Sequence, residues 1–251
     1  MKNIKKILLT MAMTMALGTS AFAASGFEFL FQLAGGVGVT IPNKGYKENF
    51  PDIKGQLSAD ADVSAQIGYM FQVVDRFGIS VLGELGYSWD AYMLGYGDTS
   101  YTSNGDNYTT KDGMSIQQYY HSFKLGLLPK FNIGVGKGAI AIGIGGGVKI
   151  PLAGHQSIIN TIAGDSQPKD SVYFDNKVDF KRKDITDIFS PSVIGYMKVT
   201  FDYYLFFTDN IGMNFGLYLG GDFAPKLKNT KIGTDAFDFG LQLGFRFGPK
   251  A

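Results

Sequence analysis

The sequence of 251 residues contains no cysteine, two histidines and one tryptophan. Without cysteine the chain has no disulfide framework, no thiolate metal site and no lipid-modified N-terminal cysteine. Two histidines alone do not provide a zinc-type set of ligands. Basic and acidic residues nearly balance, 23 against 22, and are scattered along the chain. This distribution gives no support to nucleic-acid binding.

Long apolar runs are absent as well. No stretch reaches the roughly 18 consecutive apolar residues that mark a transmembrane helix. The chain is nevertheless rich in glycine, tyrosine and phenylalanine, with 34, 14 and 21 residues. A transmembrane β-barrel uses these residues as small lumen fillers and as aromatic belts at the membrane boundaries.

The N-terminal segment has the three parts of a secretory signal peptide. Lys2, Lys5 and Lys6 form a positive region, 7–17 is apolar, and 21–23 reads Ala-Phe-Ala, an A-x-A cleavage site. Cleavage after Ala23 divides the chain into a signal peptide, 1–23, and one mature domain, 24–251. The mature domain carries 20 basic and 22 acidic residues.

Eight segments of the mature chain carry an apolar or aromatic residue at every second position. Successive side chains of a strand point to opposite faces, so each segment predicts a strand with one apolar and one polar face. The predicted strands are 27–41, 59–73, 77–94, 116–128, 140–150, 193–207, 211–223 and 237–247.

The connections between these segments alternate in length. Long polar stretches follow the first, third, fifth and seventh segments, at 43–58, 95–115, 151–189 and 224–234. Short ones, at 74–76, 129–138 and 208–210, follow the second, fourth and sixth. Outer-membrane barrels have short periplasmic turns and longer extracellular loops. The pattern therefore predicts periplasmic termini and four extracellular loops.

Strand number, loop asymmetry and export signal resemble the small outer-membrane barrels of the OmpA-domain, OmpX and OmpW type over the whole mature chain. The resemblance implies an all-β fold: a transmembrane antiparallel up-and-down β-barrel of eight strands in the outer-membrane bilayer. It also implies insertion by the barrel assembly machinery, which reads a terminal aromatic residue in the last strand. Phe245 and Phe247 fit that signal, and 248–251 extend beyond it.

Two other folds fit parts of this pattern. A soluble antiparallel barrel or sandwich also alternates, but its apolar face forms a core and its loops have no long and short order. A membrane barrel of ten strands results if 155–163 and 171–181 form an additional hairpin. The polar Ser157, Asn160 and Thr161 make the first of these segments a poor lipid-facing surface.

Charged residues on the polar faces form the main candidate site. The cluster predicted for the barrel interior is Glu28, Asp60, Asp62, Glu84, Lys124, Lys149, Lys198, Asp202 and Arg246. Glu28 with Arg246, and Glu84 with Lys124, lie on neighbouring strands. An eight-stranded interior is just wide enough for side chains to fill, so a plug of paired charges is expected. The alternative is a narrow pore lined by those charges.

Aromatic residues at the strand ends predict two girdles at the headgroup level. One girdle consists of Phe27, Phe29, Phe71, Phe77, Phe207, Phe245 and Phe247. The other consists of Tyr87, Trp89, Tyr119, Phe237 and Phe239.

The sequence His155-Gln156-Ser157 places a histidine and a serine on one face of an extended segment, where a histidine can activate a hydroxyl. The pair also resembles outer-membrane lipid A deacylases, for which Asp165 is the matching acid in the same loop. The competing interpretation is a solvated loop histidine. Asp60 and Asp62 do not follow the spacing of a calcium loop.

The sequence thus predicts a non-enzymatic outer-membrane barrel without cofactor, whose loops contact an extracellular ligand or host surface or serve the structure of the envelope. A small channel for ions or apolar solutes is the first alternative. A lipid-modifying hydrolase is the second.

Overall fold

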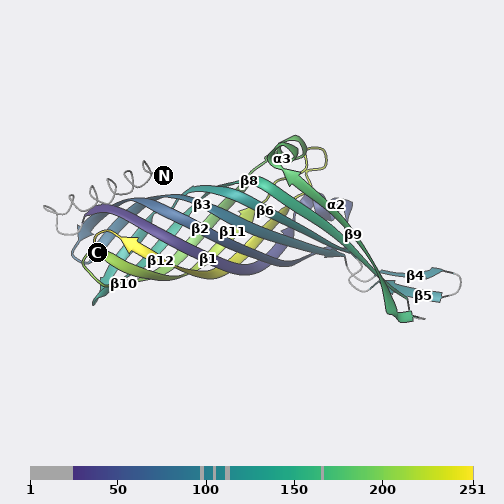
Figure 1. Cartoon of the computed structure of the whole chain (residues 1–251), viewed down its shortest axis with the longest axis horizontal. Helices are drawn as coiled ribbons and strands as arrows, with labels where there is room; N and C mark the ends of the chain where they lie inside the picture. Colours follow the sequence, from purple (N-terminus) through teal and green to yellow (C-terminus); the bar gives the residue numbers. More distant parts are fainter. Residues whose placement is uncertain (1–24, 97–98, 104–105, 111–113, 165–166, 251) are drawn as a thin grey trace, which may run out of the picture.

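The computed structural model describes residues 25–96, 99–103, 106–110, 114–164 and 167–250. The predicted signal peptide, 1–23, lies outside these residues. The described chain is mostly strand, and its strands wrap around a single axis (Figure 1).

Eight antiparallel strand positions close into one ring. Its members are β1 (Gly26–Pro42), β2 (Ile53–Val74), β3 (Phe77–Tyr96), β6 (Met114–Leu127) with β7 (Lys130–Val135), β8 (Gly138–Gly164), β10 (Ile194–Phe206), β11 (Ile211–Phe223) and β12 (Thr234–Phe247). The chain runs from neighbour to neighbour, β12 returns to β1, and pairing of β8 with β10 completes the circle. The predicted eight-stranded up-and-down barrel is confirmed.

The fourth strand is longer than the sequence pattern suggested. We expected a turn at 129–138, but β6 and β7 continue one another in the same register against both β3 and β8. Pro129 interrupts the hydrogen-bond ladder at one residue without ending the strand. Directly before it, the Leu128 amide still donates to the Leu82 carbonyl of β3 at 2.8 Å. The turn itself is confined to Gly136 and Lys137, where Gly136 takes a φ of +56° that favours glycine.

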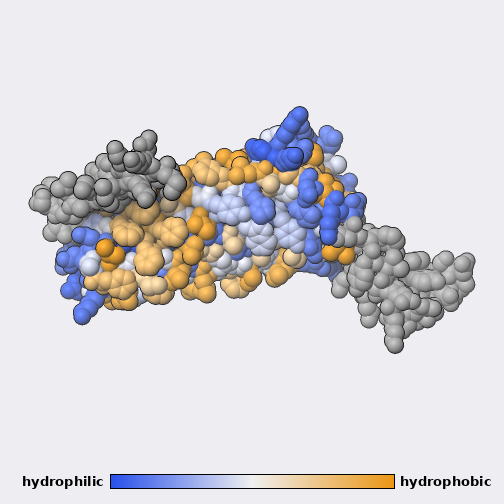
Figure 2. Space-filling model, viewed as in Figure 1, coloured by the Kyte–Doolittle hydropathy of each residue, from blue (hydrophilic) through white to orange (hydrophobic). Residues whose placement is uncertain are grey.

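The outer wall of the barrel is apolar. Side chains of the outward phase are exposed, such as Leu241 at 66%, Leu127 at 64% and Met197 at 62%. The inward phase is buried and largely polar. Figure 2 shows the resulting orange band between two hydrophilic ends. A soluble barrel would bury its apolar phase, so that alternative is wrong.

The long and short connections lie at opposite ends of the barrel (Figure 1). Short turns join β2 to β3, β7 to β8 and β10 to β11, and the C-terminal segment lies beside them, where the Gly248 amide bonds the Asn210 carbonyl at 2.9 Å. The other end, called the outer end below, carries α2 (Lys44–Asn49), β4 (Thr99–Ser103), β5 (Asp106–Thr110), β9 (Gln167–Lys181) and α3 (Arg182–Ile188). Within the described residues no helix has the length and apolar character to cross a membrane.

The insert after residue 150 builds a hairpin that leaves the barrel. β8 continues beyond the predicted Ile150 to Gly164, and β9 pairs back along it from Gln167 to Lys181. In the described residues β9 has no other strand partner, whereas β10 pairs with the lower part of β8. The hairpin therefore rises above the ring and adds no strand to it, so the ten-stranded alternative is wrong.

Arg182 lies at the fork, the point where the strand paired with β8 changes from β10 to β9. Its guanidinium donates to the Pro151 carbonyl at 3.2 Å and to the Ser192 carbonyl at 2.6 Å. These carbonyls lie on either side of the fork. Because a charged donor strengthens such bonds, Arg182 ties the base of the hairpin to the barrel wall.

The assigned lipid face generates a direct test. We expect Leu243→Arg to lower the free energy of unfolding by about 2 to 4 kcal/mol, because it places a charge on the lipid-facing wall. The measurement is denaturant unfolding of the barrel folded in phosphatidylcholine vesicles. Lys228→Arg, in an exposed outer loop, is the control and should leave stability unchanged. Equal effects at the two positions would contradict the assigned phase.

Candidate functional site: the barrel lumen

The lumen near the short turns is filled by Arg246 and its partners. The Arg246 Nε lies 2.9 Å from the Glu28 carboxylate, and Nη1 donates to Asn132 at 3.2 Å. Ser80 donates to Glu28 at 2.5 Å, and the guanidinium lies 4.4 Å from the ring centre of Tyr204. The structure thus brings together the first ion pair expected from sequence, with both side chains fully buried.

Lys130 belongs to this lumen but was missed in the sequence. Its ammonium donates to Asp202 at 2.9 Å and to the Tyr204 hydroxyl at 3.2 Å, and it has no exposed surface. The sequence pattern predicts a turn at 129–138, which is wrong for 130–135. The alternation of Phe131, Ile133 and Val135 with inward Lys130 and Asn132 contains the missing signal.

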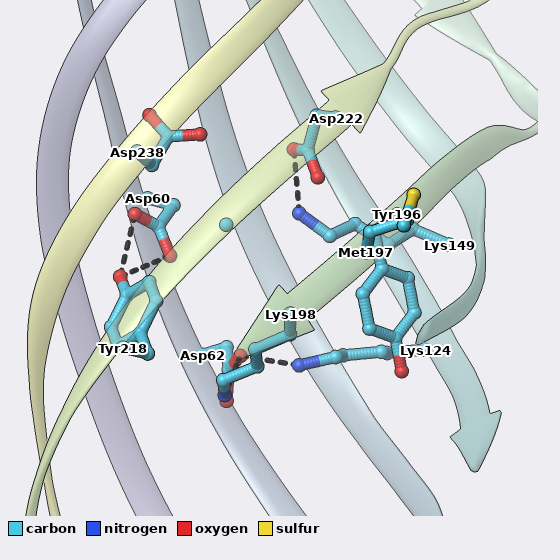
Figure 3. Close-up of a pocket in the computed structure, with 11 residues that line it drawn as sticks. Asp60, Asp62, Lys124, Lys149, Tyr196, Met197, Lys198, Tyr218, Asp222 and Asp238 are labelled. Atoms are coloured by element: carbon cyan, nitrogen blue, oxygen red, sulfur yellow. Dashed lines mark hydrogen bonds and ion pairs between the residues drawn. The ribbon is translucent and has the colours of Figure 1, made fainter. Parts of the chain in front are cut away.

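Lys124 bridges two acids at mid-height. It donates to Asp62 at 2.6 Å and lies 3.3 Å from Glu84, the partner expected from sequence. Lys198 lies 3.9 Å from the same Asp62 carboxylate. All four groups are buried. Figure 3 shows both lysines directed toward Asp62.

Two tyrosines cross the lumen wall over pairs of glycines. Four residues lie side by side in register on consecutive strands: Tyr196 on β10, Gly147 on β8, Gly126 on β6 and Glu84 on β3. The Tyr196 hydroxyl reaches across both glycines and donates to Glu84 at 2.6 Å. A Cβ built on Gly126 would collide with that hydroxyl. The absence of side chains at the two glycines therefore makes the crossing possible.

Tyr218 repeats this arrangement in the opposite direction. From β11 its ring passes Gly240 on β12 and Gly36 on β1. The hydroxyl then donates to Asp60 on β2 at 2.6 Å. The two tyrosines start on neighbouring strands and end on neighbouring strands, so together they involve all eight positions of the ring. Lys124 lies 4.8 Å above the Tyr196 ring and Lys198 lies 4.9 Å above the Tyr218 ring, as cation–π contacts.

The upper charged layer is centred on Lys149. Its ammonium donates to Asp90 at 2.6 Å and to Asp222 at 2.7 Å, and Tyr92 donates to Asp222 at 2.9 Å. A cavity of about 20 Å³ remains between this layer and the tyrosines (Figure 3). That volume suits about one water molecule.

Two apolar layers cover the charges at the outer end. The first consists of Tyr92, Tyr120, Ile194, Ala224 and Ala236. The second consists of Tyr46, Ile53, Leu94 and Ile232. Tyr46 comes from α2, where burial raises the pKa of its phenol to about 12, so the group stays neutral. Residues of the loops thus complete the seal of the lumen.

The predicted girdle residues all lie on the outward phase of the wall. At the short-turn end Phe27, Phe71, Phe207, Phe245 and Phe247 are exposed, and Phe29 and Phe77 are half-buried. At the outer end Tyr87, Phe237 and Phe239 are exposed, and Trp89 and Tyr119 are half-buried. Their role at the lipid boundaries stays a prediction.

His155 has a different acidic partner from the one expected. Its Nδ1 lies 2.6 Å from Asp179, the register partner across the β8–β9 hairpin. Asp165, the acid suggested by the sequence, lies outside the described residues. Ser157 is only 4% exposed, which leaves its hydroxyl little access to a bulky substrate. In the described part of the chain, no group of three or more His, Cys, Asp or Glu side chains is placed to hold a metal ion.

Comparisons with known proteins give only distant similarities. No protein-family profile and no curated protein matches the chain. Among solved structures, the outer-membrane protease OmpT of Escherichia coli matches at 9% identity over 92% of this chain and 99% of that one, with a TM-score of 0.41. Neisserial surface protein A matches at 8% over 89% and 99%, with a TM-score of 0.36. Ail of Yersinia pestis, solved with the heparin analogue sucrose octasulfate, matches at 9% over 88% and 99%, with a TM-score of 0.31.

These similarities are too distant to transfer an activity or a ligand. The closed ring, apolar wall and polar interior of the chain itself give it the architecture of the small outer-membrane β-barrels that its sequence resembles.

The crossing of Tyr196 over Gly147 and Gly126 generates one prediction. Gly126→Ala should displace the Tyr196 hydroxyl from Glu84 and lower stability by about 1.5 to 3 kcal/mol, the value of a hydrogen bond to a charged group. In vesicle-based unfolding, Tyr196→Phe should cost a similar amount, and the double variant should cost less than the sum. Gly220→Ala is the control, because the nearest atom to its Cβ lies at 3.8 Å. Strict additivity of the two changes would contradict the crossing.

The bridging lysine generates a second prediction. Lys124→Gln leaves Asp62 and Glu84 without their shared cation, so stability should fall by about 3 to 5 kcal/mol. Removing one acid as well, with Glu84→Gln in the same chain, restores neutrality because Lys198 still faces Asp62, and it should recover most of that loss. Lys137→Gln, in an exposed turn, should have no effect. A mild loss for Lys124→Gln alone would indicate a hydrated lumen.

Proposed function

We propose that this chain is a non-conducting, non-enzymatic outer-membrane barrel that anchors an extracellular β-projection for contacts outside the cell. In this proposal the lumen serves stability and the outer end serves function. Export by the signal peptide 1–23 and insertion by the barrel assembly machinery are parts of the same proposal.

The observation that carries the proposal is the filled lumen. Its mid-height charges are paired within the protein, two tyrosines cross it, and two apolar layers cover it. A conducting pore needs a hydrated path lined by groups that bind ions weakly. The paired groups and the cavity of about 20 Å³ favour a plug over the channel alternative.

The outer end supports the second half of the proposal. The β8–β9 hairpin is an extension of the barrel wall with paired strands, held at its base by Arg182. α3 follows directly, with exposed Lys183 and Asp187. A projection whose two strands pair with one another loses less conformational entropy on binding than an irregular loop, which suits recognition of a partner. The buried Ser157 hydroxyl gives no comparable support to the hydrolase alternative.

Conductance tests the proposal. The purified barrel in planar bilayers should give no stepwise current, because paired charges and two crossing tyrosines fill its lumen. A known porin inserted under the same conditions is the positive control. Stable open-channel steps whose ion selectivity shifts with Lys124→Gln would contradict the plug and favour the channel.

A shortened chain tests the role of the projection. Gly154 and Phe180 are register partners, so residues 155–179 can be replaced by an Asn-Gly turn that keeps the strand pairing below. Both forms are applied to an array of host-surface proteins and glycans. We expect the full chain to bind components that the shortened chain does not. Identical binding by the two forms would contradict the proposal.

A further inference from the structure

The lipid-facing wall carries an open hollow of about 550 Å³ across β2, β3, β6 and β8. Two outward glycines produce it, because Gly83 and Gly146 flank Leu127 in register from either side. Leu85, Leu125 and other apolar side chains form its borders. The hollow therefore has the shape and polarity to take an acyl chain.

A row of polar aromatic side chains lies above the hollow on the same strands. The Tyr87 hydroxyl and His121 Nδ1 are 2.5 Å apart, and Trp89 stacks on Tyr119 at 6.0 Å between ring centres with 20° between planes. Tyr119 in turn lies 6.1 Å from the His155 ring. His155 bonds Asp179 on β9 at 2.6 Å. Both histidines and the single tryptophan of the chain thus lie in one surface row.

The opposite side of the barrel shows that this row is not a general property of the outer boundary. A second hollow of about 440 Å³ lies over Gly35, between Leu33, Leu241 and Leu243. The residues above it on β1 and β12, Val37, Val39, Phe237 and Phe239, are exposed and apolar. Of these two sides of the barrel, the β3–β6–β8 side combines a hollow with hydrogen-bonding aromatic rings.

We propose that the β3–β6–β8 face binds one glycolipid molecule with a phosphorylated sugar head from the outer leaflet. Its acyl chain fills the hollow and its head group lies against the aromatic row. Gly83 and Trp89 are six residues apart on β3, about 20 Å along a strand. That separation matches an amphiphile with one part in the hydrocarbon and one part in the headgroup region. The ligand is a lipid of the outer leaflet and not an extracellular partner, although His155 and Asp179 also belong to the base of the β8–β9 hairpin.

The chemistry of the row suits a sugar. Flat rings such as Trp89 and Tyr119 offer π faces to the C–H face of a pyranose, while the imidazoles and the Asp179 carboxylate bond its hydroxyl groups. Lys181, the exposed register partner of Ala153 on the same outward face, supplies a positive charge for a phosphate.

The single tryptophan makes the site directly observable. The purified full-length mature barrel is reconstituted in vesicles of brominated phosphatidylcholine, whose bromine atoms quench Trp89 fluorescence. Lipid A, a phosphorylated glucosamine disaccharide with acyl chains, is added in steps. We expect half-maximal recovery of fluorescence at a mole fraction at least tenfold lower than with unbrominated phosphatidylcholine. Equal curves would overturn the proposal.

Two variants locate the binding. Gly83→Leu places a side chain in the hollow, where its Cβ has an ordinary contact of 3.6 Å, and should move the lipid A curve most of the way to that of phosphatidylcholine. Lys181→Gln should weaken the preference several-fold. Gly221→Leu is the matched control, because it adds the same side chain to the opposite lipid face with 3.8 Å of space, and should change nothing.

Additional titrations distinguish a glycolipid from other molecules that could cover this face. Phosphatidylglycerol provides negative charge without a sugar, and a curve equal to that of lipid A would overturn the assignment of a sugar head. Fluorescence recovery that depends on the protein-to-lipid ratio would show a second copy of the barrel covering this face, and would also overturn the proposal. If Gly221→Leu also lost the preference for lipid A over phosphatidylcholine, the preference would not depend on the hollow, and the proposal would be overturned.

Discussion

No water reaches the backbone of a strand inside a bilayer, so the peptide groups of this chain must pair with one another around a closed ring. Pairing of β8 with β10 completes that ring, and eight strands fix its width. The interior is then too narrow for bulk water and too polar to be left empty. Each buried charge must therefore meet a partner inside the lumen, as Lys124, Lys149 and Arg246 do. The filled lumen is a consequence of closure with this strand number.

Glycines, which have no side chain, leave free space on both the inner and the outer face of that ring. Inward glycines allow the rings of Tyr196 and Tyr218 to lie against the wall and reach acids three strands away. Outward glycines such as Gly83 leave hollows on the lipid side. The same residue type thus supports a rigid interior and a shaped exterior. Function can then reside outside the lumen, at the projection and on the lipid-facing wall, because the interior already has a structural role.

Periodicity and connection length were enough to predict the ring, its polarity and the two ends. The pairing of Glu28 with Arg246 could also be predicted, because both lie on inward faces near the same ends of adjacent strands. Pro129 predicts the end of a strand, because proline cannot donate to the ladder, so the sequence pattern did not reveal that Lys130 and Asn132 continue it. The pairing of His155 with Asp179 and the crossing of Tyr196 depend on register between distant strands. Single-strand periodicity gives the face of a residue but not its height relative to neighbours, so these contacts needed the structure.

Thiol accessibility inside the lumen tests the central claim most directly. Ser64 is 1% exposed on the inward phase of β2, and the chain has no cysteine, so Ser64→Cys introduces a single thiol at mid-barrel. A small water-soluble methanethiosulfonate reagent should leave this thiol unmodified in the folded barrel and modify it after unfolding, whereas a cysteine at the exposed Lys137 should react in both states. Rapid modification of Ser64→Cys in the folded barrel would show a water-filled lumen and contradict the account.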